Sequence, residues 1–141
     1  MPVRDANAVW NGDIARGEGL MKLGSGAYEG KYSVPTRFEN AAGTNPEELI
    51  GAAHAGCFSM ALSAGLTKAG LKPNRIETNA KVHINKVGEG WKITLIELST
   101  TGDVPGIDEK KFVEHAEQAK KGCPVSQALT GTEIKLQAKL G

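Results

Sequence analysis

The chain has 141 residues, a length typical of one domain, so we expect residues 1–141 to form a single domain with its own core. Its 17 lysine and arginine residues are balanced by 16 aspartate and glutamate residues. The basic excess that phosphate backbones and anionic lipids attract is missing, so we expect neither nucleic acid nor a membrane as a partner. The first seven residues have no apolar run behind their charges, unlike a signal peptide, which favours a cytoplasmic location.

Short strands and turns are expected in the first third of the chain, which is rich in glycine and polar residues. The runs 8–10 and 27–32 are the candidate strands. The pair Asn11-Gly12 could form a hairpin tip, but Asp13-Ile14 continues the extended pattern. We therefore expect the chain to turn at Gly17–Gly19.

A long helix is expected from Pro46 to about Lys68. Asn45 is an N-cap residue, proline occupies the first helical position, and Glu48 stands where a capping box places its glutamate. Gly70 and then a proline supply the stop signals. The helix is apolar or small on every side after its first turn, so it must be covered all round, and a partner subunit is a reasonable hypothesis.

Two further features of this helix shape the expectations. Residues 49–66 are uncharged for 18 positions, about the shortest length that spans a bilayer, but the serines, glycines and histidine within them favour a buried helix of a soluble protein. Small residues recur at a spacing of four, which would let another helix approach closely; they are Gly51, Ala55, Ser59 and Ser63.

The last half of the chain alternates strands and helices. Apolar and polar residues alternate from Ile76 to Ile84, which predicts a strand with one wet face, and a second strand follows over Trp91–Thr101. Asp108 is the predicted N-cap of an amphipathic helix that stops at Gly122. A short helix begins at Cys123-Pro124, and residues 134–140 alternate as a final strand. This mixed order predicts an α+β fold.

The two cysteines, Cys57 and Cys123, are ambiguous by themselves. A cysteine within a buried helix is often only a small hydrophobe, and one at a helix start can be a plain cap residue. The N-terminus of a helix nevertheless favours a thiolate, and cytosolic disulfides are usually catalytic or redox sensing. Sequence cannot show whether the two residues come within disulfide range.

Three segments together resemble the OsmC/Ohr family: Thr36–Glu39, Gly43–Leu62 and Gly122–Ser126. Similar features run from Trp10 to the last strand, so the resemblance covers nearly the whole chain. Within the family, His54 and the Gly-Ile-Asp near residue 107 are more similar to the osmotically inducible branch than to the organic hydroperoxide resistance branch.

The resemblance implies an OsmC-like fold, in which mostly antiparallel strands surround a buried central helix, and an intertwined homodimer. It implies a peroxidase that reduces organic hydroperoxides, and hydrogen peroxide less efficiently, to alcohols. Cys57 would attack the peroxide, Cys123 would form a disulfide with it, and Arg37 and Glu47 would complete the site. An external dithiol, such as a lipoyl-type reductant, would reopen the disulfide, and no metal, flavin or haem would be required.

The implied roles of Arg37 and Glu47 have a physical basis. A guanidinium can stabilise the Cys57 thiolate and the developing alkoxide, and a carboxylate can hold the guanidinium through a bidentate contact. The alternatives are a solvated loop charge for Arg37 and helix-dipole complementation for Glu47. Ten residues of helix, roughly 15 Å, separate Glu47 from Cys57. Either Arg37 bridges this gap from a long loop or the neighbouring subunit supplies Arg37 and Glu47, and we favour the second hypothesis.

His54 shares a helix face with Cys57 and could be a base, a metal ligand or, more often for such a residue, a hydrogen-bonded core histidine. A zinc site would need further ligands, and His83 and His115 are expected on surfaces, so the sequence gives little support for one. The rival to an enzyme is a redox-sensing or ligand-binding stress protein with a regulatory disulfide. Turnover separates the two, since a sensor would oxidise only once per site.

Overall fold

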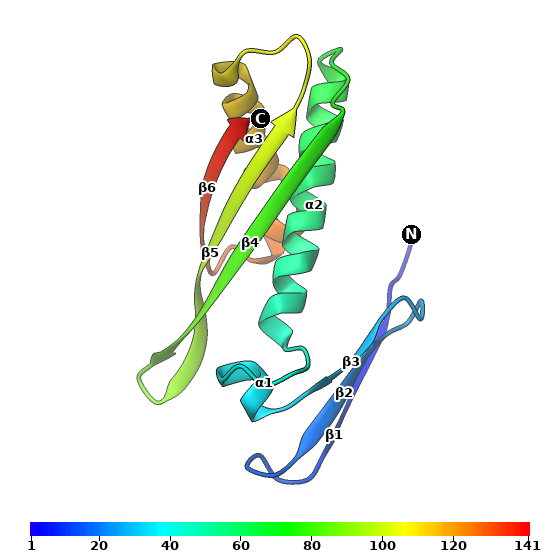
Figure 1. Cartoon of the computed structure of the whole chain (residues 1–141), viewed down its shortest axis with the longest axis vertical. Coiled ribbons are helices and arrows are strands. Elements are labelled where there is room, and N and C mark those ends of the chain that lie inside the picture. The colour runs from blue at the N-terminus through cyan, green and yellow to red at the C-terminus, as the bar shows by residue number, and fades with distance from the viewer. The chain divides into compact units, whose positions relative to one another are not determined.

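The computed structural model describes residues 1–141, and its backbone forms two compact units, Met1–Leu49 and Ile50–Gly141. Each unit contains one three-stranded sheet, and helices accompany both (Figure 1). The long helix α2 (Pro46–Lys68) begins in the first unit and belongs mainly to the second. The expected α+β class is confirmed.

The sheet of the first unit is an antiparallel meander of β1 (Ala6–Asn11), β2 (Glu18–Leu23) and β3 (Glu29–Tyr32). Strand β1 ends at Asn11, and Gly12 has a φ of 97°, a conformation that favours glycine. The expected turn at Gly17–Gly19 is therefore wrong, because Gly19 lies inside β2 and pairs with Trp10. The chain turns over residues 12–17 instead.

A short helix that we did not predict, α1 (Val34–Phe38), follows β3. Ser33 caps it: its hydroxyl accepts from the Thr36 backbone N–H, and the Thr36 hydroxyl accepts from the Ser33 backbone N–H. Pro35 lies in the first turn, where its missing N–H costs nothing. These start signals are present in the sequence, but the segment is too short to show helical periodicity.

The predicted long helix is confirmed as α2, with the expected cap and end. The Asn45 side chain accepts from the Glu48 backbone N–H at 2.8 Å, and Gly70 follows the last turn with a φ of 86°. The Glu48 carboxylate accepts from the Thr44 hydroxyl at 2.7 Å, rather than from the cap residue's own N–H. Both polar groups therefore anchor the start of α2.

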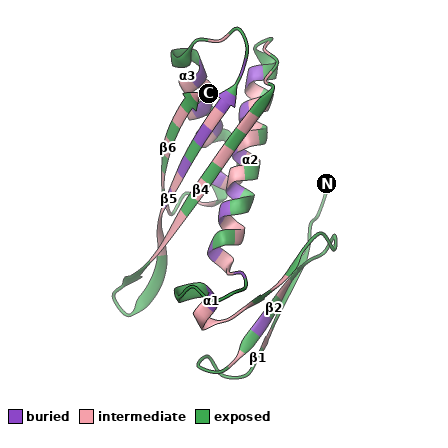
Figure 2. Ribbon diagram, in the orientation of Figure 1, coloured by how far each residue is buried: buried purple, intermediate pink, exposed green.

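Only one face of α2 is buried within the chain, as the purple bands in Figure 2 show. The buried positions recur every three or four residues and are Glu47, Gly51, His54, Phe58, Leu62 and Leu66. An exposed, uncharged face is formed by Ala52, Gly56, Met60 and Ala64, which we call the outer face. By length and composition alone α2 could cross a membrane, but core helices of soluble proteins pass the same test, so this evidence is weak.

Two of the small residues at spacing four, Gly51 and Ser59, face a strand of their own chain rather than another helix. A Cβ on Gly51 would lie 3.2 Å from a Val82 methyl and 3.7 Å from the Ala80 Cβ, and the Ser59 hydroxyl contacts the Thr78 hydroxyl at 2.7 Å. These residues therefore let α2 approach a strand of its own chain closely.

That strand belongs to the second sheet, which contains β4 (Arg75–Val87), β5 (Gly90–Asp103) and β6 (Glu133–Leu140) in this order. Strands β4 and β5 form an antiparallel hairpin, whereas β5 and β6 are parallel. The two long predicted strands are confirmed, each extended by a few residues. Between β5 and β6 lie α3 (Glu109–Gly122), capped by Asp108 as expected, and the short α4 (Pro124–Ala128).

The core of the second unit lies between one face of this sheet and the two longer helices. It is formed by the buried residues Phe58, Leu62, Leu66, Ile96, Leu98, Val104, Phe112, Ala116, Ala119 and Cys123. Strand β5 lies over the Phe112 ring at Gly102, where a Cβ would be only 2.5 Å from a ring carbon. Cys123 is thus part of the core, and the cysteine on α2 packs against it.

Candidate active site

The two cysteines meet in the second unit, although 66 residues separate them in sequence. Cys57 lies on α2 and Cys123 at the start of α4, and their sulfur atoms are 2.9 Å apart. Both are free thiols. Cys57 is partly exposed and Cys123 is fully buried. A modest approach of the sulfurs would therefore form a disulfide.

Cys123 is held between two helices. Its backbone N–H donates to the Ala119 carbonyl at 2.9 Å, which ends α3, and its sulfur accepts from the Ser126 backbone N–H at 3.5 Å, which caps α4. Pro124 occupies the first position of α4. The expected cap role of Cys123 is confirmed, and it fixes the direction of the sulfur.

The two thiols differ in acidity, because the pKa of Cys57 is raised and that of Cys123 is lowered. Burial raises the pKa of Cys57, and its hydrogen bond with Cys123 raises it further. Burial opposes ionisation of Cys123 as well, but hydrogen bonds from Cys57 and from the backbone and hydroxyl of Ser126 lower its pKa below the ordinary value. These contacts therefore favour ionisation of Cys123 over ionisation of Cys57.

His54 is fully buried one turn before Cys57, but its partner is Ser126 on α4. Its Nε2 lies 2.7 Å from the Ser126 hydroxyl oxygen, and Nδ1 has no hydrogen-bond partner. Burial lowers the pKa of His54, so the ring is neutral near pH 7. The hydrogen-bonded core position is observed rather than a direct base and nucleophile pair with Cys57.

Arg37 and Glu47 contact each other in the first unit. The Arg37 Nε lies 3.0 and 3.2 Å from the two Glu47 carboxylate oxygens, and Nη2 donates to Oε1 at 2.6 Å. The Glu47 side chain is 7% exposed and that of Arg37 is 39% exposed. Phe38 packs beside the guanidinium, with its ring centre 5.5 Å from Cζ. The carboxylate therefore orients one edge of the guanidinium.

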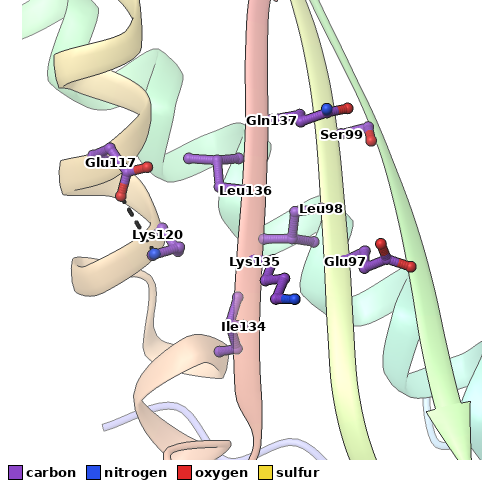
Figure 3. Close-up of a pocket in the computed structure, with 9 residues that line it drawn as sticks. All are labelled: Glu97, Leu98, Ser99, Glu117, Lys120, Ile134, Lys135, Leu136 and Gln137. Atoms are coloured by element: carbon purple, nitrogen blue, oxygen red, sulfur yellow. Dashed lines mark ion pairs between the residues drawn. The ribbon is translucent and has the colours of Figure 1, made fainter.

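Two other features are poor candidates for chemistry. A hollow of ≈ 460 Å³ beside β6 is lined by both polar and apolar side chains from α3, β5 and β6, and neither cysteine lines it (Figure 3). Its Glu117 and Lys120 form an ion pair at 3.3 Å and so partly neutralise each other. His83 lies on the wet face of the sheet and contacts Glu97 at 2.7 Å. No group of three or more potential metal ligands is present.

A buried thiol and a partly exposed thiol in contact, held by a central helix and a helix N-terminus, define a two-cysteine redox domain of α+β fold. The chain belongs to the OsmC-like protein family, whose sequence model matches residues 39–139.

Named relatives support this membership over nearly the whole chain. Peroxiredoxin OsmC of Escherichia coli (strain K12) is 50% identical over 138 residues, which cover 97% of this chain and 96% of that protein. The organic hydroperoxide resistance protein of Xanthomonas axonopodis pv. citri is 32% identical over 117 residues, covering 81% and 80%. The resemblance to the OsmC/Ohr family is thereby confirmed, and the higher identity agrees with the osmotically inducible branch.

A solved structure gives the same answer for the fold. The organic hydroperoxide resistance protein of Elizabethkingia anophelis superposes with a TM-score of 0.80 at 26% identity, and the match covers 99% of each chain.

Proposed function

We propose that the protein is a thiol-dependent peroxidase in which Cys57 attacks an organic hydroperoxide and Cys123 then forms a disulfide with it. The observation that carries this proposal is the 2.9 Å contact between two free cysteine sulfurs. The names of the relatives, peroxiredoxin and organic hydroperoxide resistance protein, support the activity. We further propose that the enzyme is soluble and cytoplasmic, where disulfides of this kind are transient.

The reaction has three balanced steps. The Cys57 thiolate attacks one oxygen of R–O–O–H, the O–O bond breaks, and the alkoxide takes a proton to leave as an alcohol. The resulting sulfenic acid reacts with the Cys123 thiol, giving the disulfide and water. An external dithiol, which we propose to be of the lipoyl type, then reduces the disulfide to two thiols and is itself oxidised to a disulfide.

Accessibility supports this division of roles. Cys57 is partly exposed, so a peroxide can reach its sulfur, whereas Cys123 is fully buried. Formation of the Cys57 thiolate requires a further stabilising group, because burial and the contact with Cys123 raise the pKa of Cys57. A cation beside Cys57 would move the negative charge to the attacking sulfur.

We propose that Arg37 is this cation and that Glu47 orients it. The contact with Glu47 uses Nε and Nη2, so Nη1 remains for a thiolate or a peroxide oxygen. Because Glu47 and Cys57 are ten residues apart on α2, roughly 15 Å along a straight helix, one subunit cannot bring them together through that helix. We therefore propose that Arg37 and Glu47 of one subunit serve Cys57 of the other subunit in a homodimer.

The outer face of α2 supports the dimer. Met60, on the outer face, is 77% exposed, and Ala52, Gly56 and Ala64 beside it are exposed as well. A second subunit would remove this apolar surface from water. Met60→Asp should shift the protein toward monomers in analytical ultracentrifugation, whereas Thr130→Asp, in the exposed turn after α4, should not. A wild-type monomer would contradict the proposal.

The chemical roles are tested by two cysteine variants under an excess of dithiol. Cys57→Ser should consume no organic hydroperoxide, and Cys123→Ser should reduce about one equivalent per subunit and then stall or overoxidise. The wild type should turn over many times. Consumption that stops at one equivalent in the wild type would indicate a regulatory disulfide, and full turnover in Cys57→Ser would end the proposal.

The origin of Arg37 is tested by mixing two inactive variants, Arg37→Ala and Cys57→Ser. If Arg37 acts across the dimer, each mixed dimer contains one complete site, in which the intact Cys57 of one subunit meets the intact Arg37 of the other. With equal amounts and random reassociation, half of the dimers are mixed, so about a quarter of the wild-type activity should return. If Arg37 acts within its own subunit, the mixture should stay inactive.

A further inference from the structure

His54 and Ser126 form a buried polar pair that the three reaction steps do not use. Ser126 is 4% exposed, and His54 and Cys123 are fully buried. The Ser126 hydroxyl lies 2.7 Å from His54 Nε2, and the Ser126 backbone N–H donates to the Cys123 sulfur at 3.5 Å. Ser126 on α4 thus links His54 on α2 to the sulfur that closes the disulfide.

The unpaired Nδ1 of His54 indicates the direction of these hydrogen bonds. A neutral imidazole carries one proton, and a buried N–H without an acceptor is rarer in proteins than a buried acceptor without a donor. The proton therefore belongs on Nε2, where an acceptor is present, and Nδ1 keeps its lone pair. His54 then donates to the Ser126 oxygen, which leaves the Ser126 hydroxyl proton free to turn toward Cys123, where such a hydrogen bond lowers the pKa of the thiol.

We propose that His54 is a positioning residue, which holds the Ser126 hydroxyl toward Cys123 and so prepares that sulfur for disulfide formation. The inference rests on the proposed function, because it concerns its second step. Once Cys57 is a sulfenic acid, the contact between the two thiols at 2.9 Å is no longer present. The backbone N–H and the hydroxyl of Ser126 then remain to stabilise the Cys123 thiolate as it attacks.

The proton balance of this step is simple. Cys123 loses its thiol proton, its sulfur bonds to the Cys57 sulfur, and the sulfenic hydroxyl leaves with that proton as water. His54 and Ser126 end the step as they began it. Their contribution is a fixed hydrogen bond to the attacking sulfur, and hydrogen bonds to charged groups are the stronger ones.

The first test isolates Cys123 in a Cys57→Ala background, where it is the only thiol in the chain. The ultraviolet absorbance of the thiolate then reports the Cys123 pKa; the other ionisable group in this hydrogen-bonded cluster is His54. Ser126→Ala and His54→Leu should each raise the Cys123 pKa. His54→Gln, whose amide can donate to Ser126, should stay near the parent value. An unchanged pKa in Ser126→Ala would overturn the inference.

The second test keeps both cysteines and follows one turnover by stopped flow. Ser126→Ala and His54→Leu should slow disulfide formation relative to sulfenic acid formation, by about tenfold or more if a hydrogen bond to a charged sulfur is lost. Mass spectrometry should then find more overoxidised Cys57. His54→Gln should restore the ratio of the two rates, and a ratio as low as that of His54→Leu would overturn the positioning role. Absence of any sulfenic acid in the wild type would instead reject the proposed function. The first test would still measure the Cys123 pKa, because it does not depend on a reaction with peroxide.

Discussion

Removal of the Arg37 charge should cost this protein more stability than removal of an exposed arginine. In Arg37→Met the side chain keeps much of its length but loses three hydrogen-bond contacts with Glu47, a carboxylate only 7% exposed. An abandoned buried charge costs about 3–5 kcal/mol, and the 39% exposure of Arg37 lets water reduce that cost. We therefore expect the free energy of unfolding to fall by about 2 kcal/mol.

The chain offers a matched control in Arg75→Met. Arg75 contacts Glu77 at 3.0 Å, but the two side chains are 67% and 65% exposed, so the loss should be about 0.5 kcal/mol or less. Urea unfolding followed by circular dichroism measures both variants, at one protein concentration because association changes apparent stability. The double variant Arg37→Met/Glu47→Met should recover part of the loss, because it removes the unpaired carboxylate as well.

Equal losses in Arg37→Met and Arg75→Met would refute this reasoning. It would mean that Glu47 is solvated as well as the exposed Glu77, and that the contact with Arg37 does not hold the guanidinium in a fixed orientation.

Two further predictions concern the second unit. Gly102→Ala should lower the free energy of unfolding by about 1–3 kcal/mol, because its Cβ would lie 2.5 Å from a Phe112 ring carbon. The control is Gly90→Ala, whose Cβ would have no contact closer than 4.0 Å. Thermal unfolding compares the two variants, and equal melting temperatures would contradict the prediction. His54 should make stability fall with decreasing pH: its folded pKa is lowered by burial below its ordinary value of 6.5, so the unfolded chain binds more protons and the stability present above pH 6.5 is lost as pH falls. Melting temperatures of wild type and His54→Gln between about pH 5 and 7.5 should diverge on the acid side, and parallel curves would show that His54 does not contribute.

The regular elements of the second unit were predictable because their signals are local. The cap at Asn45, the alternation of Ile76–Ile84 and the N-cap Asp108 each involve residues that are neighbours along the chain, and the structure confirms the helices and strands they predict. The short helix α1 was missed because five residues are too few to display a helical period. The turn after β1 was misplaced because Asp13-Ile14 keeps an extended pattern even though the ladder has already ended at Asn11.

In the site, too, some features were predictable from the sequence and others depended on the tertiary structure. The sequence alone determined which residues carry the chemistry to be tested. The two thiols, the arginine and the glutamate are recognised by residue type and by the neighbouring sequence, which resembles that of the OsmC/Ohr family. Contact between Cys57 and Cys123, the neutral His54 bound to Ser126, and the burial of Glu47 against Arg37 were decided only by the tertiary structure. The physical reason is that a distance across 66 residues, and the burial that shifts a pKa, depend on how helices and strands pack, which no local pattern records.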